Sequence, residues 1–143
     1  VPDSGPPYAT TQDLVECAGV VMGSPTRLVN MDAALKHFID NTVGEWMSAA
    51  CVGKPFGLFT STSSLHGGQE STLLSMALPL IHHGMIYVGI PWTEEAMSTT
   101  TTGGTPYGAS HVSWSREHEL SDDEKELAQA LGKRVAEIAA KLA

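Results

Sequence analysis

The sequence predicts an α/β fold in which helices wrap a parallel β-sheet. Short apolar runs bounded by glycine and proline alternate along the chain with segments whose apolar residues have helical spacing. The apolar runs lack polar–apolar alternation, which is typical of strands covered on both faces. Right-handed crossovers then place helices on both faces of the sheet. The 143 residues are enough for one domain, which we place at residues 1–143.

Three apolar runs are the predicted strands. Residues 16–23 lead into Gly-Ser-Pro, and their adjacent valines favour a strand over a buried helix. The second run, residues 55–60, begins with a proline, which a strand tolerates at its first position. The third run, residues 85–90, is stopped by Pro91.

Helical spacing marks the segments that follow the first two strands. Met31 begins a set of apolar residues at i, i+4, i+7 and i+8, with Asn30 as the predicted N-cap. A second stripe runs from Leu73 to Leu80 and is closed by Gly84 as the predicted C′ residue. Pro79 is expected to kink or shorten this second helix.

The last helix has the clearest signals. Ser121 and Glu124 have the spacing of a capping box, and one apolar stripe runs from Leu127 to Leu142. Acidic residues gather between Glu117 and Glu126, and we expect them to form the solvated start of this helix.

Composition limits the classes of function. The formal net charge of −8 gives a surface that repels phosphate backbones, so we expect no nucleic-acid partner. Cys17 and Cys51 are far apart in the sequence and are expected to be reduced, partly buried thiols. No leader pattern opens the chain and no apolar run reaches membrane-spanning length, so we expect a cytoplasmic protein without membrane insertion.

Ligands of open parallel α/β sheets bind outside the carboxyl ends of the strands. This rule selects the loops at residues 24–30, 61–68 and 91–92. Two of these loops are rich in hydroxyls, small residues and backbone N–H groups, and they lack the residue sets of metal or Ser-His-Asp hydrolytic sites. Loops of this kind suit a flat, neutral, hydrogen-bonding ligand such as a flavin ring.

Four motifs in these regions resemble those of one family. Residues 23–31 resemble G-[ST]-P-T-R-[FY]-G-N-M, and residues 60–62 with 67–70 resemble S-T…G-G-Q-E. Residues 82–85 match H-H-G-M, and residues 103–109 match G-G-[TS]-P-Y-G-A. In this order they resemble the FMN-dependent NAD(P)H:quinone oxidoreductases of the tryptophan-repressor-binding-protein (WrbA) type. The resemblance implies a flavodoxin-like three-layer sandwich with a parallel sheet.

The resemblance also implies a set of site residues. The flavin edge is expected to contact Pro25, Thr26, Arg27 and Leu28. The ring and ribityl side are expected to contact Ser61, Thr62, Ser63, Ser64, Leu65 and His66. His82 resembles the catalytic histidine that faces the flavin from a neighbouring subunit, and Trp46 and Trp92 resemble aromatic walls of the substrate pocket. Leu28 and Val29 depart from the pattern, because the family usually has an aromatic residue and a glycine there.

Taken singly, these residues have structural explanations as well. Arg27 is equally well explained as a surface cation, and the run Ser61–Ser64 as a polar loop that caps the next helix. His82 suits the last turn of a helix, where the dipole favours a partly charged imidazole. Trp46 is more often a core residue than a substrate contact.

The family's activity is a ping-pong reaction that needs no protein nucleophile. A nicotinamide dinucleotide, NADH or NADPH, delivers hydride to FMN, and a quinone then enters the same pocket and takes two electrons. His82 is the expected proton or hydrogen-bond donor to the reduced quinone. The family forms homodimers that pair into tetramers.

The start of the chain leaves a second hypothesis open. Flavodoxin-like folds begin with a strand, a phosphate-binding loop and a helix, and we expect this N-terminal βαβ portion to be absent here. The first strand would then expose an apolar edge to another chain. The alternative function is therefore a truncated, flavin-free interaction or oligomerisation module. A hydrolase of another α/β type is disfavoured, because no Gly-x-Ser-x-Gly elbow is present.

Overall fold

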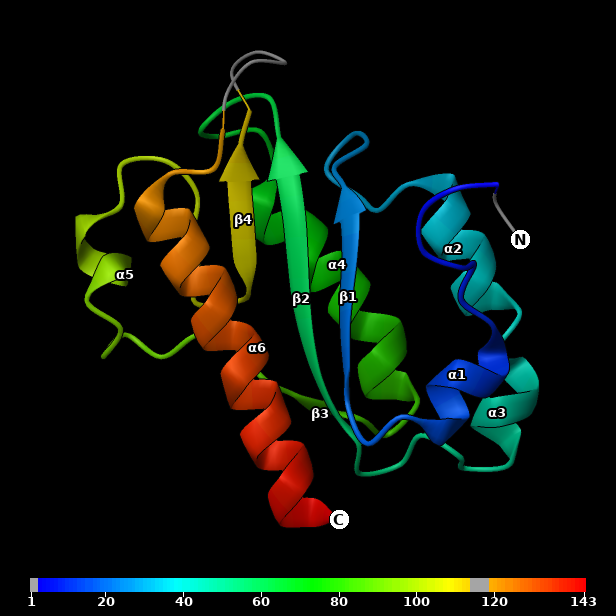
Figure 1. Ribbon diagram of the computed structural model, residues 1–143. Coiled ribbons are helices and arrows are strands. Elements are labelled where there is room, and N and C mark those ends of the chain that lie inside the picture. Colours follow the sequence, from blue (N-terminus) through cyan, green and yellow to red (C-terminus); the bar gives the residue numbers. More distant parts are fainter. Residues whose placement is uncertain (1–2, 114–118) are drawn as a thin grey trace.

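A four-stranded, fully parallel sheet organises the chain (Figure 1). This computed structural model describes residues 3–113 and 119–143. The central strand is β2 (Pro55–Thr62), which pairs with β1 (Val20–Pro25) along one edge. On its other edge, the start of β2 pairs with β3 (Ile86–Tyr87) and its end pairs with β4 (Ala109–Val112).

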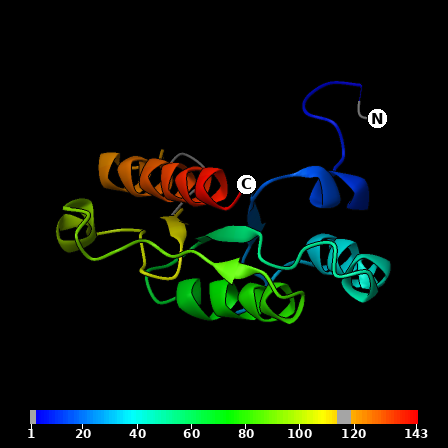
Figure 2. The ribbon, with the colours of Figure 1, turned by 90° about the horizontal axis from the view of Figure 1, so that it is seen from below.

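Helices cover the two faces of the sheet and the flank of β1 (Figure 2). One face carries α4 (Gln69–His82) and the opposite face carries α6 (Asp122–Leu142). Beside β1 lie the short helices α1 (Thr11–Glu16), α2 (Ala33–Asp40) and α3 (Val43–Met47), and α5 (Ala96–Thr99) packs on α6.

Each long helix buries its apolar stripe in a separate cluster. On the α4 side, Phe56 and Leu58 of the central strand pack in a cluster with Leu73 and Met76, and all four side chains are at most 1% exposed. On the α6 side, the cluster is built around residues 127–135 of that helix and the segment after β3. The local periodicity predicts the buried faces of the two helices correctly as far as Ile138, whereas Leu142, the last residue of the predicted α6 stripe, is 56% exposed.

Several predicted boundaries are confirmed, and one cap is corrected. Ser121 and Glu124 form the predicted capping box of α6, and Gly84 follows α4 with a φ of +80°. The N-cap of α2 is Asp32 rather than Asn30, because its carboxylate accepts a hydrogen bond from the N–H of Leu35. Pro79 does not end α4, which continues to His82.

The strand predictions need two corrections. The first strand begins at Val20 rather than at residue 16, because residues 11–16 form α1 behind its own capping box. The third strand pairs only at Ile86–Tyr87, and its place beside the second half of β2 is taken by β4, which the sequence analysis missed.

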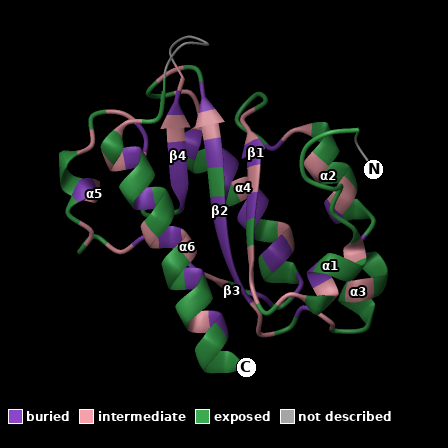
Figure 3. Cartoon of the chain, in the orientation of Figure 1, coloured by how far each residue is buried: buried purple, intermediate pink, exposed green. Residues whose placement is uncertain are grey.

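The sheet is not covered evenly, contrary to the expectation from its apolar strands (Figure 3). Val21 of β1 is 40% exposed and Phe59 of the central strand is 48% exposed. The ring of Phe59 lies over Gly23, where an added Cβ would meet it at 2.0 Å. Among the described residues, β1 pairs with β2 alone.

Two further expectations concern the cysteines and membrane-spanning helices. The cysteines are free, with Cys51 buried and Cys17 half-buried. Within the described residues, no helix combines the length and the apolar character needed to cross a membrane.

Candidate functional site

The loops predicted to bind a ligand meet at the carboxyl edge of the sheet. Strand register places Pro25 beside Ser61, and Ser61 beside His111. The N–H of Thr26 donates to the carbonyl of Ser61 across 3.0 Å, which ties the loop after β1 to the end of β2. The two loops named by the motifs are therefore neighbours, as the carboxyl-end rule predicts.

The loop after β1 is a tight, strained turn. The N–H of Arg27 donates to the carbonyl of Asn30 at 2.8 Å, and the reverse bond is 3.1 Å. Between them Leu28 and Val29 have φ values of +51° and +62°, a region that favours glycine. This conformation explains why a glycine suits position 29, and it leaves the Leu28 side chain 97% exposed.

Hydrogen bonds to α4 also anchor this turn. The hydroxyls of Thr26 and Thr72 share a hydrogen bond of 2.6 Å, which fastens the loop to α4. The guanidinium of Arg27 donates to the carbonyl of Thr26 at 2.9 Å and stays exposed. Its cation is therefore available at the rim of the site.

The loop after β2 is organised around one carbonyl. The carbonyl of Ser64 accepts hydrogen bonds from the Thr62 hydroxyl, the Gln69 amide and the Gly67 N–H, at 2.8, 2.8 and 3.1 Å. Ser63, Leu65 and His66 are exposed around it. Among the described residues no side chain caps the start of α4, so the expectation that this serine run caps the helix is wrong.

The described residues fit the ring side of FMN. The Oε1 atom of Gln69 is buried without a hydrogen-bond partner, although the whole residue is only 4% exposed. The first turn of α4 offers backbone N–H groups that no side chain caps. The edge of an isoalloxazine carries amide-like N–H and C=O groups. The unpaired Gln69 acceptor, the uncapped N–H groups of α4 and the hydroxyls of the neighbouring loop are suitable hydrogen-bond partners for that edge.

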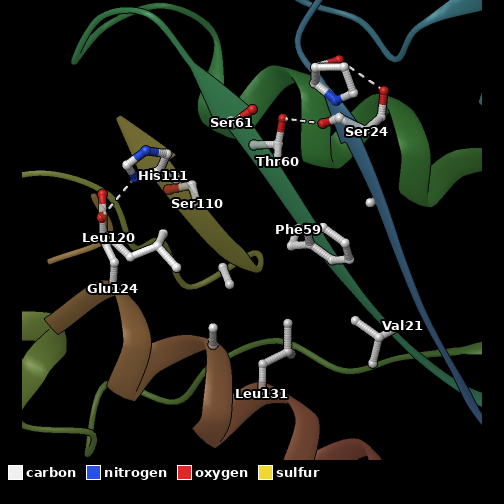
Figure 4. A pocket seen from close by; sticks show the side chains of 14 residues that line it. Val21, Ser24, Phe59, Thr60, Ser61, Ser110, His111, Leu120, Glu124 and Leu131 are labelled. Atoms are coloured by element: carbon white, nitrogen blue, oxygen red, sulfur yellow. Dashed lines mark hydrogen bonds and ion pairs between the residues drawn. The ribbon is translucent and has the colours of Figure 1, made fainter. Parts of the chain in front are cut away.

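A cavity of about 440 Å³ lies below this edge, between the sheet and α6 (Figure 4). Its floor is apolar, with Val21, Phe59 and Leu131 pointing into the same space. Its polar wall includes Ser61 and His111 at the strand ends. The cavity suits a ligand with a flat apolar body and a polar edge.

One wall of the cavity contains a tightly held carboxylate. Glu124 is 3% exposed, and its Oε2 accepts hydrogen bonds of 2.9 Å from His111 Nδ1 and from the Ser121 N–H. Its Oε1 accepts from the N–H groups of Gly103 and Val112 at 2.9 and 3.0 Å. Burial acts to raise the pKa of Glu124, but these hydrogen bonds outweigh it and lower the pKa to about 2.

Glu124 and His111 are the functional candidates that sequence reasoning missed. The expectation of a solvated acidic helix start is wrong for Glu124, while Glu117 lies outside the described residues. The capping box predicts its bond to Ser121, but the partner at His111 depends on β4, which the sequence did not reveal.

The remaining predicted residues lie elsewhere. The imidazole of His82 stacks on Trp46, with ring centroids 5.3 Å apart, and the indole N–H donates to the His82 carbonyl at 3.2 Å. The helix α4 starts at the carboxyl edge with Gln69 and spans about 20 Å. His82 therefore lies near the amino edge, away from Ser61 of the same chain.

His83 and Trp92 complete the set of predicted aromatic positions. His83 is buried, and its Nε2 shares a hydrogen bond of 2.8 Å with the Thr42 hydroxyl. Burial lowers the pKa of His83, which indicates a neutral, structural imidazole. Trp92 is 83% exposed and makes no ring contact with Trp46 in the described chain.

An exposed apolar surface surrounds His82. We call it the α3–α4 apolar face, and it consists of Val43, Trp46, Met47, Leu74, Leu78 and Ile81. Each of these side chains is at least 42% exposed. Exposed apolar residues grouped in this way are typical of protein–protein contacts.

Comparison with known proteins agrees with this geometry. The sequence profile of the NADPH-dependent FMN reductase family matches residues 2–96. An "NAD(P)H dehydrogenase (quinone)" of Aromatoleum aromaticum is 43% identical over 139 residues, which cover 95% of this chain and 67% of the relative. A protein of the same name from Geotalea daltonii is 42% identical over 139 residues, covering 95% and 68%.

A solved structure extends the comparison to the fold. The "flavodoxin, WrbA-like protein from Agrobacterium tumefaciens" superposes with a TM-score of 0.73 and 25% identity, covering 92% of this chain and 72% of that one. The flavodoxin-like fold implied by the motifs is thus confirmed. The chain belongs to the NADPH-dependent FMN reductase family, and within it resembles the WrbA-type quinone oxidoreductases.

Proposed function

We propose that this protein reduces quinones by two electrons with NAD(P)H as donor and FMN as cofactor. The observation that carries the proposal is that the loops after β1 and β2 are hydrogen-bonded to each other. They lie beside the start of α4, where no described side chain caps the backbone N–H groups. Both curated relatives carry the name NAD(P)H dehydrogenase (quinone), which supports the same reaction. FMN, when bound, would supply the acceptance and release of hydride.

The residues that would hold FMN come from these two loops. Residues 25–28 would contact the ring edge, and residues 61–66 would surround the ring and ribityl side. The buried Oε1 of Gln69 would accept a hydrogen bond from the ring edge. The protein's contribution is placement, because its loops are fixed by backbone bonds before any ligand arrives.

Alternating occupancy of one pocket would give ping-pong kinetics. The nicotinamide would leave before the quinone enters, so one site would serve both rings. Trp46 and Trp92 remain proposed substrate contacts, with exposures of 44% and 83%, and in this chain the Trp46 ring stacks on His82.

Assembly would bring His82 to a ligand. Because His82 lies at the other end of α4 from Ser61, it would reach a flavin only in a neighbouring copy. The α3–α4 apolar face surrounds it and offers the surface for such a homodimer. Pairs of dimers would form the tetramer that the resemblance implies.

Flavin titration tests the proposal. Adding purified protein to FMN is expected to quench flavin fluorescence saturably. The loaded protein is expected to turn over NADH catalytically when a quinone is present. Duroquinone is a suitable acceptor because its ring positions are blocked against thiol addition. A folded protein that neither quenches FMN nor supports NADH-dependent duroquinone reduction would refute the proposed activity.

The open edge of β1 favours the flavin-free interaction module as a second candidate. Val21 and Phe59 are half-exposed on the same face of the sheet, and β1 pairs with β2 alone in the described residues. Unpaired strands with exposed apolar residues recruit other chains. Sedimentation of the flavin-free protein discriminates the two functions: assembly through β1 together with no flavin binding supports the module.

A further inference from the structure

One face of α4 contacts the loop after β1 at three successive points. Gly68, Thr72 and Ser75 are spaced at i, i+4 and i+7, so they lie on the same side of the helix. Their partners in the loop are, in the same order, Val29, Thr26 and Asn30. The start of α4 therefore supports the loop that is expected to contact the flavin edge.

Two of these three contacts are weak. An added Cβ at Gly68 would meet Val29 Cγ1 at 2.7 Å, so this contact is packing of an alkyl group over backbone. The Ser75 hydroxyl lies 3.1 Å from Asn30 Oδ1 in an exposed position and 2.8 Å from the Thr72 carbonyl oxygen, so its single proton is shared. Water competes for an exposed hydrogen bond of this kind, which lowers its net contribution.

The hydroxyl pair of Thr26 and Thr72 is the short and sheltered contact. The two oxygens are 2.6 Å apart, and Thr72 is 0% exposed. Within the described parts of the chain, neither hydroxyl has a second hydrogen-bond partner. A threonine inside a helix often donates to the carbonyl of the preceding turn, whereas the Thr72 hydroxyl bonds the loop instead.

The strained turn that follows Thr26 depends on such a contact. Two of its residues have φ values of +51° and +62°, and strain of this kind persists only where surrounding contacts hold it. The backbone bonds between Arg27 and Asn30 close the turn but do not attach it to the rest of the fold. Thr26 supplies attachments on two sides, because its N–H donates to the Ser61 carbonyl at 3.0 Å and its hydroxyl bonds Thr72.

We propose that Thr72 is a positioning residue for FMN, which acts by holding Thr26 and the turn after it in the geometry that contacts the flavin edge. This inference rests on the proposed function, in which Thr26 is one of the residues at the ring edge. Without the Thr72 hydroxyl the loop samples other positions. Binding of FMN must then also order the loop, and this entropic cost lowers the affinity.

Two substitutions of Thr72 separate positioning from packing. Thr72→Val keeps the shape of the side chain without the hydroxyl, and it is expected to raise the Kd for FMN by about tenfold. Thr72→Ser keeps the hydroxyl without the methyl, and its Kd is expected to stay within about threefold of wild type although the lost methyl lowers its stability in urea. A Kd for Thr72→Val within about twofold of wild type, or an affinity loss in Thr72→Ser at least as large as in Thr72→Val, overturns the proposal.

Thr100→Val is the matched control for the loss of a threonine hydroxyl. The Thr100 hydroxyl donates to the Gly103 carbonyl at 2.6 Å, directly after α5, whereas the loop after β1 extends from the other edge of the sheet (Figure 1). Thr100→Val is expected to bind FMN within about twofold of wild type. An affinity loss as large as that of Thr72→Val would show that the effect is not specific to the loop, and would overturn the assignment.

Hydrogen exchange of the flavin-free protein tests the contact without any cofactor. In Thr72→Val the N–H groups of Arg27 and Asn30 are expected to exchange about tenfold faster than in the wild type. The N–H of Ile86, which donates to the Lys54 carbonyl at the amino edge of the sheet, is expected to keep its rate and so controls for global destabilisation.

The two readouts separate this inference from the proposed function. A wild-type protein that does not bind FMN refutes the proposed function, whereas the exchange rates still decide whether Thr72 holds the loop. Unchanged exchange at Arg27 and Asn30 in Thr72→Val overturns the positioning role, even if the wild type binds FMN and reduces quinones.

Discussion

At the scale of single residues, backbone strain is concentrated in the loop after β1. Val29 is β-branched and has a φ of +62°, and its side chain is 55% exposed. Such residues cost on the order of 1–3 kcal/mol each when the surrounding structure holds them in place. Two backbone hydrogen bonds between Arg27 and Asn30 hold this strained turn in place at the rim of the proposed site.

Val29→Gly is expected to raise the free energy of unfolding by about 0.5–1 kcal/mol. Relief of the left-handed strain exceeds the entropy that glycine adds to the unfolded chain, and little packing is lost at an exposed position. Urea denaturation measures the change. Val52→Gly is the control, because Val52 is 61% exposed without a positive φ, and it is expected to destabilise. Equal destabilisation by both variants would contradict the strain argument.

Glu124 makes a second prediction at this scale, from its pKa. The pKa falls from 4.5 to about 2 on folding, so the carboxylate stabilises the fold above pH 4.5 and this stabilisation is lost as pH falls toward 2. The shift corresponds to about 3 kcal/mol. Glu124→Gln is expected to lower stability at neutral pH and to flatten its dependence on pH within this window.

Urea titrations at a series of pH values measure this dependence. Glu126→Gln removes an exposed carboxylate of the same helix and is expected to keep the wild-type pH profile. An unchanged acid profile for Glu124→Gln would show that the four hydrogen bonds do not hold the carboxylate ionised.

At the scale of elements, local signals decided what the sequence could predict. The stripes of α4 and α6, the capping box and the loops after β1 and β2 all depend on residues within a few positions of one another. β4 depends on pairing with residues of β2 that lie fifty positions earlier in the chain, and no local sequence pattern predicts it. The pair His111–Glu124 was missed for the same reason, because it needs β4 in place before it forms.

Pro79 gives a prediction for α4 as an element. It lies inside a helix of 14 residues, where it lacks an N–H and crowds the preceding turn. Pro79→Ala is expected to raise the free energy of unfolding by about 1 kcal/mol or more. Thermal unfolding followed by circular dichroism measures it. Ser71→Ala, at an exposed position of the same helix outside the α3–α4 apolar face, is expected to change stability by less than about 0.5 kcal/mol. A loss of stability in Pro79→Ala would mean that the packing of the proline ring contributes more to stability than the helix gains from losing the proline.

At the scale of the whole molecule, residues 3–113 and 119–143 expose two apolar surfaces, and these lead to different functions. The α3–α4 apolar face surrounds His82 and Trp46, so assembly there belongs to the proposed enzyme. The edge of β1 with Val21 and Phe59 is the surface on which a flavin-free module would recruit another chain. The surface that assembles in solution therefore discriminates the two functions.

Two matched variants decide between the surfaces. Ile81 is 49% exposed on the first and Val21 is 40% exposed on the second, so a lysine at either position adds one charge at a similar depth. The enzyme hypothesis predicts that Ile81→Lys halves the mass of the assembly measured by sedimentation equilibrium, because burying a lysine in the interface opposes association. Val21→Lys is expected to leave this mass unchanged. The reverse pattern supports the module. A concentration of about 100 µM is sufficient to populate contacts of micromolar affinity. A wild-type protein that stays monomeric at this concentration contradicts both forms of self-assembly, and His82 could then not reach a site in a neighbouring copy.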